Sequence, residues 1–280
     1  MANLLDLRVV VAALTLLVVF QGTYHSIQNS TYLDTSNPLL TSLPHPLSGT
    51  HYFASKKNPL NTIFLKRAWG WTTAVFLPLL LTSPPHPPRL RRTAQYILAT
   101  STWILFTMWF FGPALLTRLT VASGGECVLH LPGAHGTYVP IPAEYCASRT
   151  PVTIASHPHL FPLPVLVDAV GAPEGWTIVP RLRRGHDVSG HVFLLTLSAL
   201  FLADQLRQSF KAPTWSRAHA YAASATSALV SLWLFSLWVT SVYFHSPLEK
   251  ASGYLLGVAC FAVVQLPIWL SHKFAAQSKN

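Results

Sequence analysis

Two histidines stand beside the ends of long apolar segments in this sequence. His191 follows Ser189 and Gly190 at the start of one segment, and His245 follows the end of the next segment and precedes Glu249 by four residues. Positions i and i+4 are neighbours in a helix or turn, so the Glu249 carboxylate can accept a hydrogen bond from one ring nitrogen of His245. The other nitrogen is then free to act as a nucleophile or a general base.

The residues around His191 suit a phosphate group. Gly190 permits close approach of a ligand to the backbone, and the N–H groups at the start of a helix attract anions. His191 would lie beside that phosphate and could protonate a leaving oxygen. Basic side chains elsewhere in the chain could supply charge to the phosphate. The predicted phosphate-binding residues are Ser189, Gly190, Lys66, Arg184 and Lys250.

Each of these residues also has an ordinary structural interpretation. Ser189 or Asp187 can cap a helix whose first turn contains His191. His245 can be an interfacial histidine that precedes a Glu-Lys helix cap, and Pro247 predicts a turn rather than a continuous helix after it. The basic side chains can rest at a membrane interface or on anionic lipid. The sequence leaves both interpretations open.

The composition places these residues in a membrane protein. Hydrophobic residues make up 51% of the 280 residues and charged residues only 10%, against about 25% charged in soluble domains. We predict an all-α polytopic bundle of six transmembrane helices that forms a single integral membrane domain, residues 1–280. The first apolar segment could instead be a cleaved signal peptide. The expected spans are about 4–20, 62–82, 94–117, 188–205, 218–244 and 253–271, with a lumenal loop at 118–187.

The two apolar segments between His191 and His245 would cross the membrane in opposite directions, so both histidines emerge on one face. The short loops at 83–93 and 206–217 carry three basic residues each, the C-terminal tail carries two, and the loop after the fifth span carries one. The positive-inside rule therefore puts both termini in the cytosol and the histidines on the lumenal side. The net charge of +10 is interpreted as contact with phosphate headgroups, not as nucleic-acid binding.

Three further features bear on the loop and on helix packing. Cys127 and Cys146 share the long loop and can form a disulfide if that loop is lumenal, or remain free. Two cysteines do not make a zinc site, and no metal or cofactor is expected. Gly253-x-x-x-Gly257 predicts a close contact between helices.

Ser-Gly-His at 189–191, with a later histidine and an acidic residue, resembles the second and third motifs of the phosphatidic acid phosphatase superfamily. In that superfamily the later histidine attacks phosphorus, a carboxylate orients it, and the earlier histidine protonates the leaving group. By position these roles fall on His245, Glu249 and His191. The superfamily's first motif, Lys-x6-Arg-Pro, is absent, and Val239 stands where its third motif has arginine. The phosphate must therefore be held by other residues.

The sequence is more similar to the fat storage-inducing transmembrane family of the endoplasmic reticulum. The resemblance rests on Phe-Leu-Lys-Arg-Ala-Trp-Gly-Trp-Thr (64–72), Asp-Val-Ser-Gly-His-Val-Phe-Leu-Leu (187–195) and Phe-His-Ser-Pro-Leu-Glu-Lys (244–250). It covers most of the chain from the second expected span to the sixth. The proline-rich connections and the long loop resemble a fungal member.

This resemblance implies a multi-pass endoplasmic reticulum protein needed for lipid droplet formation and lipid balance. The family's activity is that of an acyl-CoA diphosphatase, which cleaves fatty acyl-CoA to acyl 4′-phosphopantetheine and adenosine 3′,5′-bisphosphate. By position, His191 and His245 would be its catalytic pair. The expected partners are fatty acyl-CoA and membrane lipids. The alternative is a non-enzymatic protein that binds diacylglycerol or triacylglycerol among its helices and partitions it into droplets.

Overall fold

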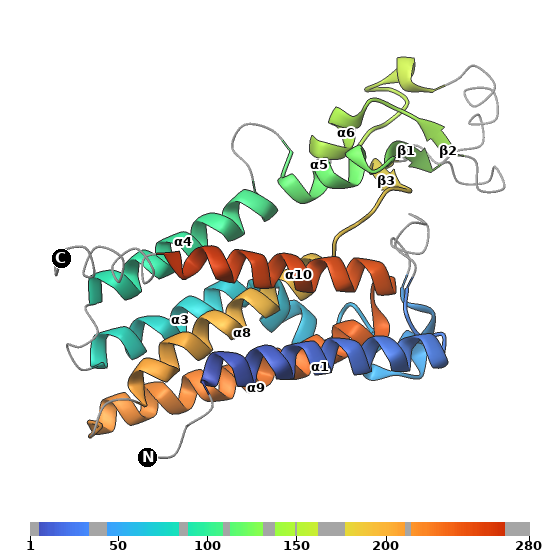
Figure 1. The fold of residues 1–280 in the computed structure, drawn as a ribbon. Coiled ribbons are helices and arrows are strands. Elements are labelled where there is room, and N and C mark those ends of the chain that lie inside the picture. The colour runs from blue at the N-terminus through green and yellow to red at the C-terminus, as the bar shows by residue number, and fades with distance from the viewer. Residues whose placement is uncertain are drawn as a thin grey trace, which may run out of the picture. The chain divides into compact units, whose positions relative to one another are not determined.

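The computed structural model divides into two compact units. The first comprises Met1–Leu33, Pro44–Leu105 and Val188–Asn280, and the second comprises Asp34–Leu43 and Phe106–Asp187. The first unit is a bundle of helices, and the second contains a small sheet with short helices (Figure 1). The structure describes residues 6–33, 44–83, 89–108, 113–130, 138–148, 150–161, 177–210 and 214–266.

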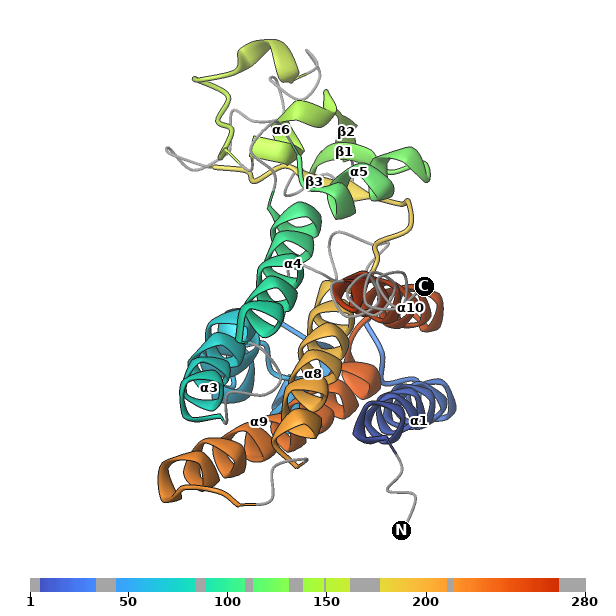
Figure 2. The ribbon, with the colours of Figure 1, turned by 60° about the vertical axis from the view of Figure 1, so that its left-hand side comes forward.

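Long helices of the first unit run alongside one another, with α8 among them (Figures 1 and 2). Their bounds are Leu7–Gln28 for α1, Ala68–Thr82 for α3, Arg89–Thr107 for α4, Gly190–Ser209 for α8, Arg217–Tyr243 for α9 and Pro247–Val264 for α10. Short 3₁₀ or π-helical turns precede α3, at Pro46–Gly49, Tyr52–Ala54, Leu60–Phe64 and Leu65–Arg67.

Helix α8 is the centre of the bundle. It packs against α1, α3, α9 and α10, and 15 of its 20 residues are buried. A helix that is apolar on every side is stable only when other helices surround it. The start of α8, which carries His191, is therefore held in place by its neighbours.

The prediction of a helical membrane protein is confirmed in its coarser form. Among the described residues, three helices are long and apolar enough to cross a membrane, namely α1, α9 and α10. Helix α1 extends well past residue 20, to Gln28. The extension packs against α9, because a Cβ atom added at Gly22 would lie 2.6 Å from the Cβ atom of Ser241.

The boundaries of three other segments differ from the expected ones. Helix α10 begins at Pro247 rather than near residue 253, because Ser246 and Glu249 form a capping box at its start. Helix α3 begins only at Ala68, after the π and 3₁₀ turns. Helix α4 ends at Thr107, well before residue 117. Residues 109–112 lie outside the described residues, and the next helix, α5 (Leu115–Ala122), belongs to the second unit.

The second unit contains a three-stranded antiparallel sheet in the order β2-β1-β3. The strands are β1 (Glu126–His130), β2 (Tyr138–Pro140) and β3 (Arg181–Arg183), and the short helix α6 spans Ala143–Ser148. A disulfide joins Cys127 on β1 to Cys146 on α6, which resolves the choice between a bonded and a free pair. The most apolar part of the loop, residues 161–170, lies outside the described residues apart from Phe161.

Candidate active site

His245 lies in the tight connection between α9 and α10. Helix α9 ends at Tyr243, Phe244 is extended, and His245 has a φ of 63°. That left-handed conformation is uncommon for a residue other than glycine and costs roughly 1–3 kcal/mol when the surroundings must hold it. Ser246 then caps α10. The sharp turn projects the His245 side chain back toward the start of α10.

The predicted contact between His245 and Glu249 is present. Nδ1 of His245 lies 3.3 Å from Oε2 of Glu249, and the two side chains are 14% and 5% exposed. The same carboxylate oxygen accepts the N–H of Ser246 at 2.8 Å, so Glu249 both caps the helix and faces the imidazole. Nδ1 has no well-aligned hydrogen-bond partner among the described residues, and such contacts often tighten only when substrate is bound.

The start of α8 lies beside the start of α10. The backbone N–H of Ser189 donates to the carbonyl of Glu249 at 3.1 Å. A Cβ atom added at Gly253 would lie 2.6 Å from the Ser189 carbonyl, and one added at Gly257 would lie 2.8 Å from Cβ of Thr196 on α8. The contact predicted from the two glycines is therefore confirmed, and it brings the first turn of α8 to Glu249.

His191 occupies that first turn. Ser189 is the N-cap of α8, and its hydroxyl accepts the N–H of Val192 at 3.4 Å, as the capping interpretation predicted. His191 lies within electrostatic range of His245 and Lys66. Two histidines that are far apart in sequence are therefore close enough to interact electrostatically at one end of the bundle, and Lys66 is within the same range of His191. We call His191, His245, Glu249 and Lys66 the histidine end.

The other predicted phosphate ligands are placed differently. Lys66 is exposed in the turn before α3, and Gly190 is the first residue of α8. Lys250 is fully buried and donates to Oγ of Ser26 and to a backbone carbonyl of α9. Arg184 belongs to the second unit, where it pairs with Glu126 at 3.6 Å. Among these cations, Lys66 is the one that the structure brings into range of His191.

A second group of contacts, at the end of α9, could not be predicted from the sequence. His45 is 3% exposed, and its Nε2 lies 2.9 Å from the Tyr243 carbonyl. The hydroxyl of Thr31 donates to the Val242 carbonyl at 2.7 Å. No local motif marks either residue, because each acts on a segment about 200 residues away.

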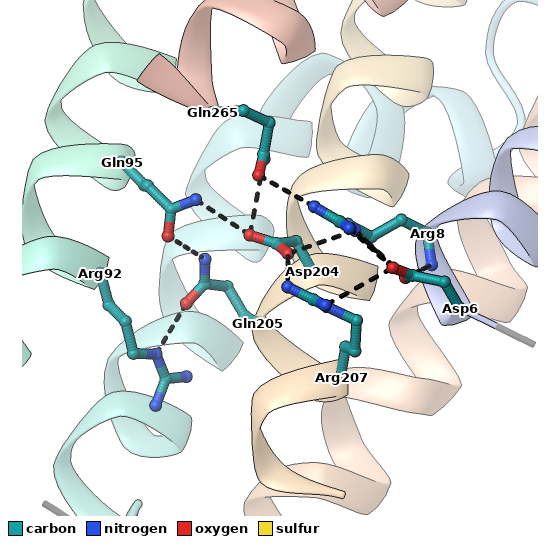
Figure 3. Close-up of polar contacts among 8 residues, drawn as sticks. All are labelled: Asp6, Arg8, Arg92, Gln95, Asp204, Gln205, Arg207 and Gln265. Carbon is teal, nitrogen blue, oxygen red and sulfur yellow. Dashed lines mark hydrogen bonds and ion pairs between the residues drawn. The ribbon is translucent and has the colours of Figure 1, made fainter. Parts of the chain in front are cut away.

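A cluster of polar side chains lies at the opposite end of the same helices (Figure 3). Its centre is Asp204, which is fully buried and accepts a hydrogen bond from Gln95 at 2.9 Å and from Arg207 at 3.3 Å. We call this group the Asp204 cluster; it consists of Asp6, Arg8, Arg92, Gln95, Asp204, Gln205, Arg207 and Gln265. In the described part of the chain, no group of three histidine, cysteine or acidic residues is arranged to hold a metal ion.

Comparisons with known proteins give a consistent result. The family described as "Fat storage-inducing transmembrane protein" matches residues 49–227 and 215–265. The chain is 30% identical over 215 residues to acyl-coenzyme A diphosphatase fit1 of Schizosaccharomyces pombe, covering 77% of this chain and 73% of that protein. It is 26% identical over 219 residues to acyl-coenzyme A diphosphatase FITM2 of Danio rerio, covering 75% and 69%. For the protein of that name from Homo sapiens the identity is 26% over 220 residues, covering 74% and 69%. No solved structure matches the chain.

Proposed function

Because the chain belongs to the fat storage-inducing transmembrane protein family, we propose that it is an acyl-coenzyme A diphosphatase. The observation that carries the proposal is the position of His245. Its Nδ1 lies 3.3 Å from the Glu249 carboxylate, and its ring lies within electrostatic range of His191. A carboxylate, two imidazoles and a nearby lysine are sufficient for phosphoryl transfer by positioning and proton transfer.

In this proposal Glu249 holds the proton on Nδ1 of His245, so that Nε2 carries the free lone pair. Nε2 either attacks one phosphorus of the acyl-CoA pyrophosphate or takes a proton from the water that attacks it. The bond between that phosphorus and the bridging oxygen breaks, and His191 gives a proton to the leaving oxygen. One water is consumed overall, and the products are acyl 4′-phosphopantetheine and adenosine 3′,5′-bisphosphate.

The negative charge of the pyrophosphate needs stabilisation in the transition state. Lys66 is exposed at the histidine end, and the N-terminus of α8 presents backbone N–H groups and the positive end of the helix dipole. We propose that these two features hold the phosphate oxygens. Lys250 and Arg184, which we also predicted as ligands, remain weaker candidates because each already has protein partners.

The proposal is tested by hydrolysis of a fatty acyl-CoA by the purified protein. The measurement is the release of adenosine 3′,5′-bisphosphate, resolved by chromatography. His245→Ala and His191→Ala should each reduce the turnover by roughly 1,000-fold or more. His51→Ala is the matched control, since His51 is an exposed histidine close to the end of α9.

Thermal unfolding in detergent shows whether each variant remains folded. A folded His245→Ala protein that retains the rate of the His51→Ala control would overturn the hydrolase proposal. If the wild-type protein binds diacylglycerol but releases no bisphosphate, the non-enzymatic alternative becomes the better explanation.

We further propose that the protein lies in the endoplasmic reticulum membrane with six spans, both termini in the cytosol and the histidine end in the lumen, where it supports lipid droplet formation. Helices α3, α4 and α8 would supply the remaining spans; α8 has 20 residues, which is long enough for a bilayer core. The disulfide in the second unit supports a lumenal position for that unit, because disulfides persist in oxidising compartments.

Glycosylation tagging tests this topology. An acceptor sequence inserted near residue 155, in the second unit, should be modified in microsomes, and the same insertion between α8 and α9 should not. The opposite pattern would reverse the orientation and place the histidine end in the cytosol.

A further inference from the structure

His45 lies outside the long helices, and both nitrogens of its buried ring contact backbone groups. Its Nδ1 accepts the backbone N–H of Leu47 at 3.1 Å. Its Nε2 lies 2.9 Å from the Tyr243 carbonyl and 3.1 Å from the Thr31 carbonyl. Because one nitrogen faces a donor and the other faces two acceptors, these contacts require a neutral ring with its proton on Nε2.

Of the two carbonyls that Nε2 of His45 contacts, that of Tyr243 belongs to the last turn of α9. Carbonyls in the last turn of a helix have no partner within the helix, so other groups must supply donors. Here each donor comes from a distant segment or from the next helix. The pairs are Lys250 Nζ to the Ser241 carbonyl at 2.6 Å, Thr31 Oγ1 to Val242 at 2.7 Å, and both Leu33 N–H at 3.1 Å and His45 Nε2 to Tyr243.

These contacts end immediately before the strained residue. Phe244 forms an isolated parallel bridge with Leu33, and the rings of His45 and Phe244 pack in a T-shaped arrangement with centroids 5.7 Å apart. His245 follows with its left-handed backbone, and the capping box at Ser246 fixes the chain on the other side. The conformation of His245 is therefore held from both sides, and His45 contributes to the preceding side.

We propose that His45 is a positioning residue for His245: its neutral ring bonds the end of α9 to the segment after α1 and so fixes the direction in which the His245 imidazole points. This inference rests on the function proposed above. It adds a residue that makes no contact with substrate, from a part of the chain that carries none of the recognised motifs. A displacement of a reacting group by about 1 Å can lower a rate by roughly 100-fold.

The surroundings of His45 favour the neutral ring that the contacts require. Burial lowers the pKa of His45 below its ordinary value of 6.5, and the nearby Lys56 and His51 act in the same direction. The hydrogen bonds to the Tyr243 and Thr31 carbonyls oppose this shift.

Two substitutions separate the donor from the ring. His45→Gln keeps an N–H donor that can reach the Tyr243 and Thr31 carbonyls, whereas His45→Phe keeps the ring against Phe244 but removes the donor. His51→Phe is the matched control, because His51 contacts Tyr243 only through its ring, at 5.9 Å between centroids. The measurements are kcat and KM for acyl-CoA hydrolysis, and amide hydrogen exchange of residues 241–246 in the unliganded protein.

We expect His45→Phe to lower kcat by roughly 10- to 100-fold with little change in KM, and to accelerate exchange in residues 241–246. His45→Gln should stay within about threefold of the wild type in kcat and preserve the slow exchange, and His51→Phe should resemble the wild type in both. If His45→Phe does not fold, Thr31→Val tests the same connection, because it removes the donor to Val242 at nearly constant volume.

Equal loss in His45→Phe and His45→Gln, or unchanged kcat and exchange in His45→Phe, would overturn the positioning role. If the wild-type protein does not hydrolyse acyl-CoA, the proposed function fails. The exchange of residues 241–246 then still decides whether His45 fixes the His245 turn.

Discussion

At one end of the bundle the Asp204 carboxylate accepts from several donors, whereas at the other end Nδ1 of His245 has no well-aligned partner among the described residues. Two nitrogens of the Asp204 cluster, Nη2 of Arg92 and Nε of Arg207, are likewise buried without a hydrogen-bond partner in that part of the chain. The carboxylate of Asp204 is contacted from four elements, by Gln95, Arg207, Arg8 and Gln265 (Figure 3). The histidine end has a left-handed backbone at His245 and an exposed Lys66.

The difference between the two ends assigns them different tasks. Ionisable residues inside a membrane bundle are costly and usually functional, but a carboxylate whose partners come from several helices mainly holds those helices together. A strained residue with open bonding capacity is typical of a reactive site. We therefore expect substitutions at the Asp204 cluster to affect stability, and substitutions at the histidine end to affect turnover.

The largest effect is expected at the Asp204 cluster. Asp204→Asn removes the buried negative charge between Arg8 and Arg207 and leaves Asp6 as their remaining acidic partner in the cluster. Breaking a buried ion pair in this way costs about 3–5 kcal/mol. Thermal unfolding in detergent measures the loss. Turnover per folded molecule should stay near that of the wild type, and a folded variant with greatly reduced turnover would contradict the separation of the two ends.

Glu249→Gln should show the opposite behaviour. Glutamine can still accept the N–H of Ser246 and preserve the capping box, but it removes the negative charge that faces His245. We expect kcat to fall by about 100-fold, equivalent to about 2.7 kcal/mol in the activation barrier, with an almost unchanged unfolding temperature. Unaltered kcat would show that Glu249 is only a helix cap.

The contact between α8 and α10 provides a graded test. A Cβ atom at Gly253 would lie 2.6 Å from the Ser189 carbonyl, and one at Gly257 would lie 2.8 Å from Cβ of Thr196. Gly253→Ala and Gly257→Ala should each cost about 1–3 kcal/mol of stability. Only Gly253→Ala should also lower kcat, by roughly tenfold, because it displaces the turn that carries His191.

Gly70→Ala is the control for these two variants, since the added methyl group would meet no described atom within 4 Å apart from its chain neighbours and its own helix backbone. It should leave both stability and kcat near wild-type values. Equal kcat losses in Gly253→Ala and Gly257→Ala would mean that the whole α8–α10 contact, rather than its end near His191, controls turnover.

The smallest expected effect is a difference in how His45 and Asp6, at opposite ends of the bundle, make stability depend on pH. Burial lowers the pKa of His45 below its ordinary value of 6.5. As pH falls below that value the unfolded chain takes up a proton at this residue that the folded protein does not, so stability decreases. At the other end, a side-chain hydrogen bond from Arg8 lowers the pKa of Asp6 from 3.8 to about 2. The Asp6 contribution is therefore complete above 3.8 and is lost only as pH falls through about 2.

When the pH is lowered from about 7 to about 5, the unfolding temperature of the wild type should therefore drop further than that of His45→Gln, because glutamine at position 45 takes up no proton. Asp6→Asn should change the unfolding temperature by the same amount at about pH 7 and at about pH 5, because both values lie above the range in which Asp6 titrates. Parallel curves for the wild type and His45→Gln would show that His45 does not contribute to acid sensitivity.

Much of the bundle could be predicted from the order of apolar segments. The bounds of α8 and α9 lie close to the expected spans, because both are long apolar runs with capping serines at their starts. The predicted start of α10, near residue 253, was too late. The capping-box pattern Ser246-Pro-Leu-Glu249 in the sequence already indicates the observed start at Pro247. The far ends of α1 and α4 could not be predicted, because packing against α9 prolongs α1, and the boundary between the two units, at Leu105 and Phe106, falls in the last turn of α4.

The sequence by itself indicated that Glu249 could face His245 and that Ser189 or Asp187 could cap the next helix, because both contacts depend on neighbours within about one helical turn. It also predicted that both histidines emerge on one face of the membrane, since successive spans run in opposite directions. Only the tertiary structure decided that Lys250 is turned inward to Ser26, that Lys66 lies within range of His191, and that His45 secures the end of α9. Those contacts join segments far apart in the chain, and their partners are set by how the helices pack rather than by local spacing.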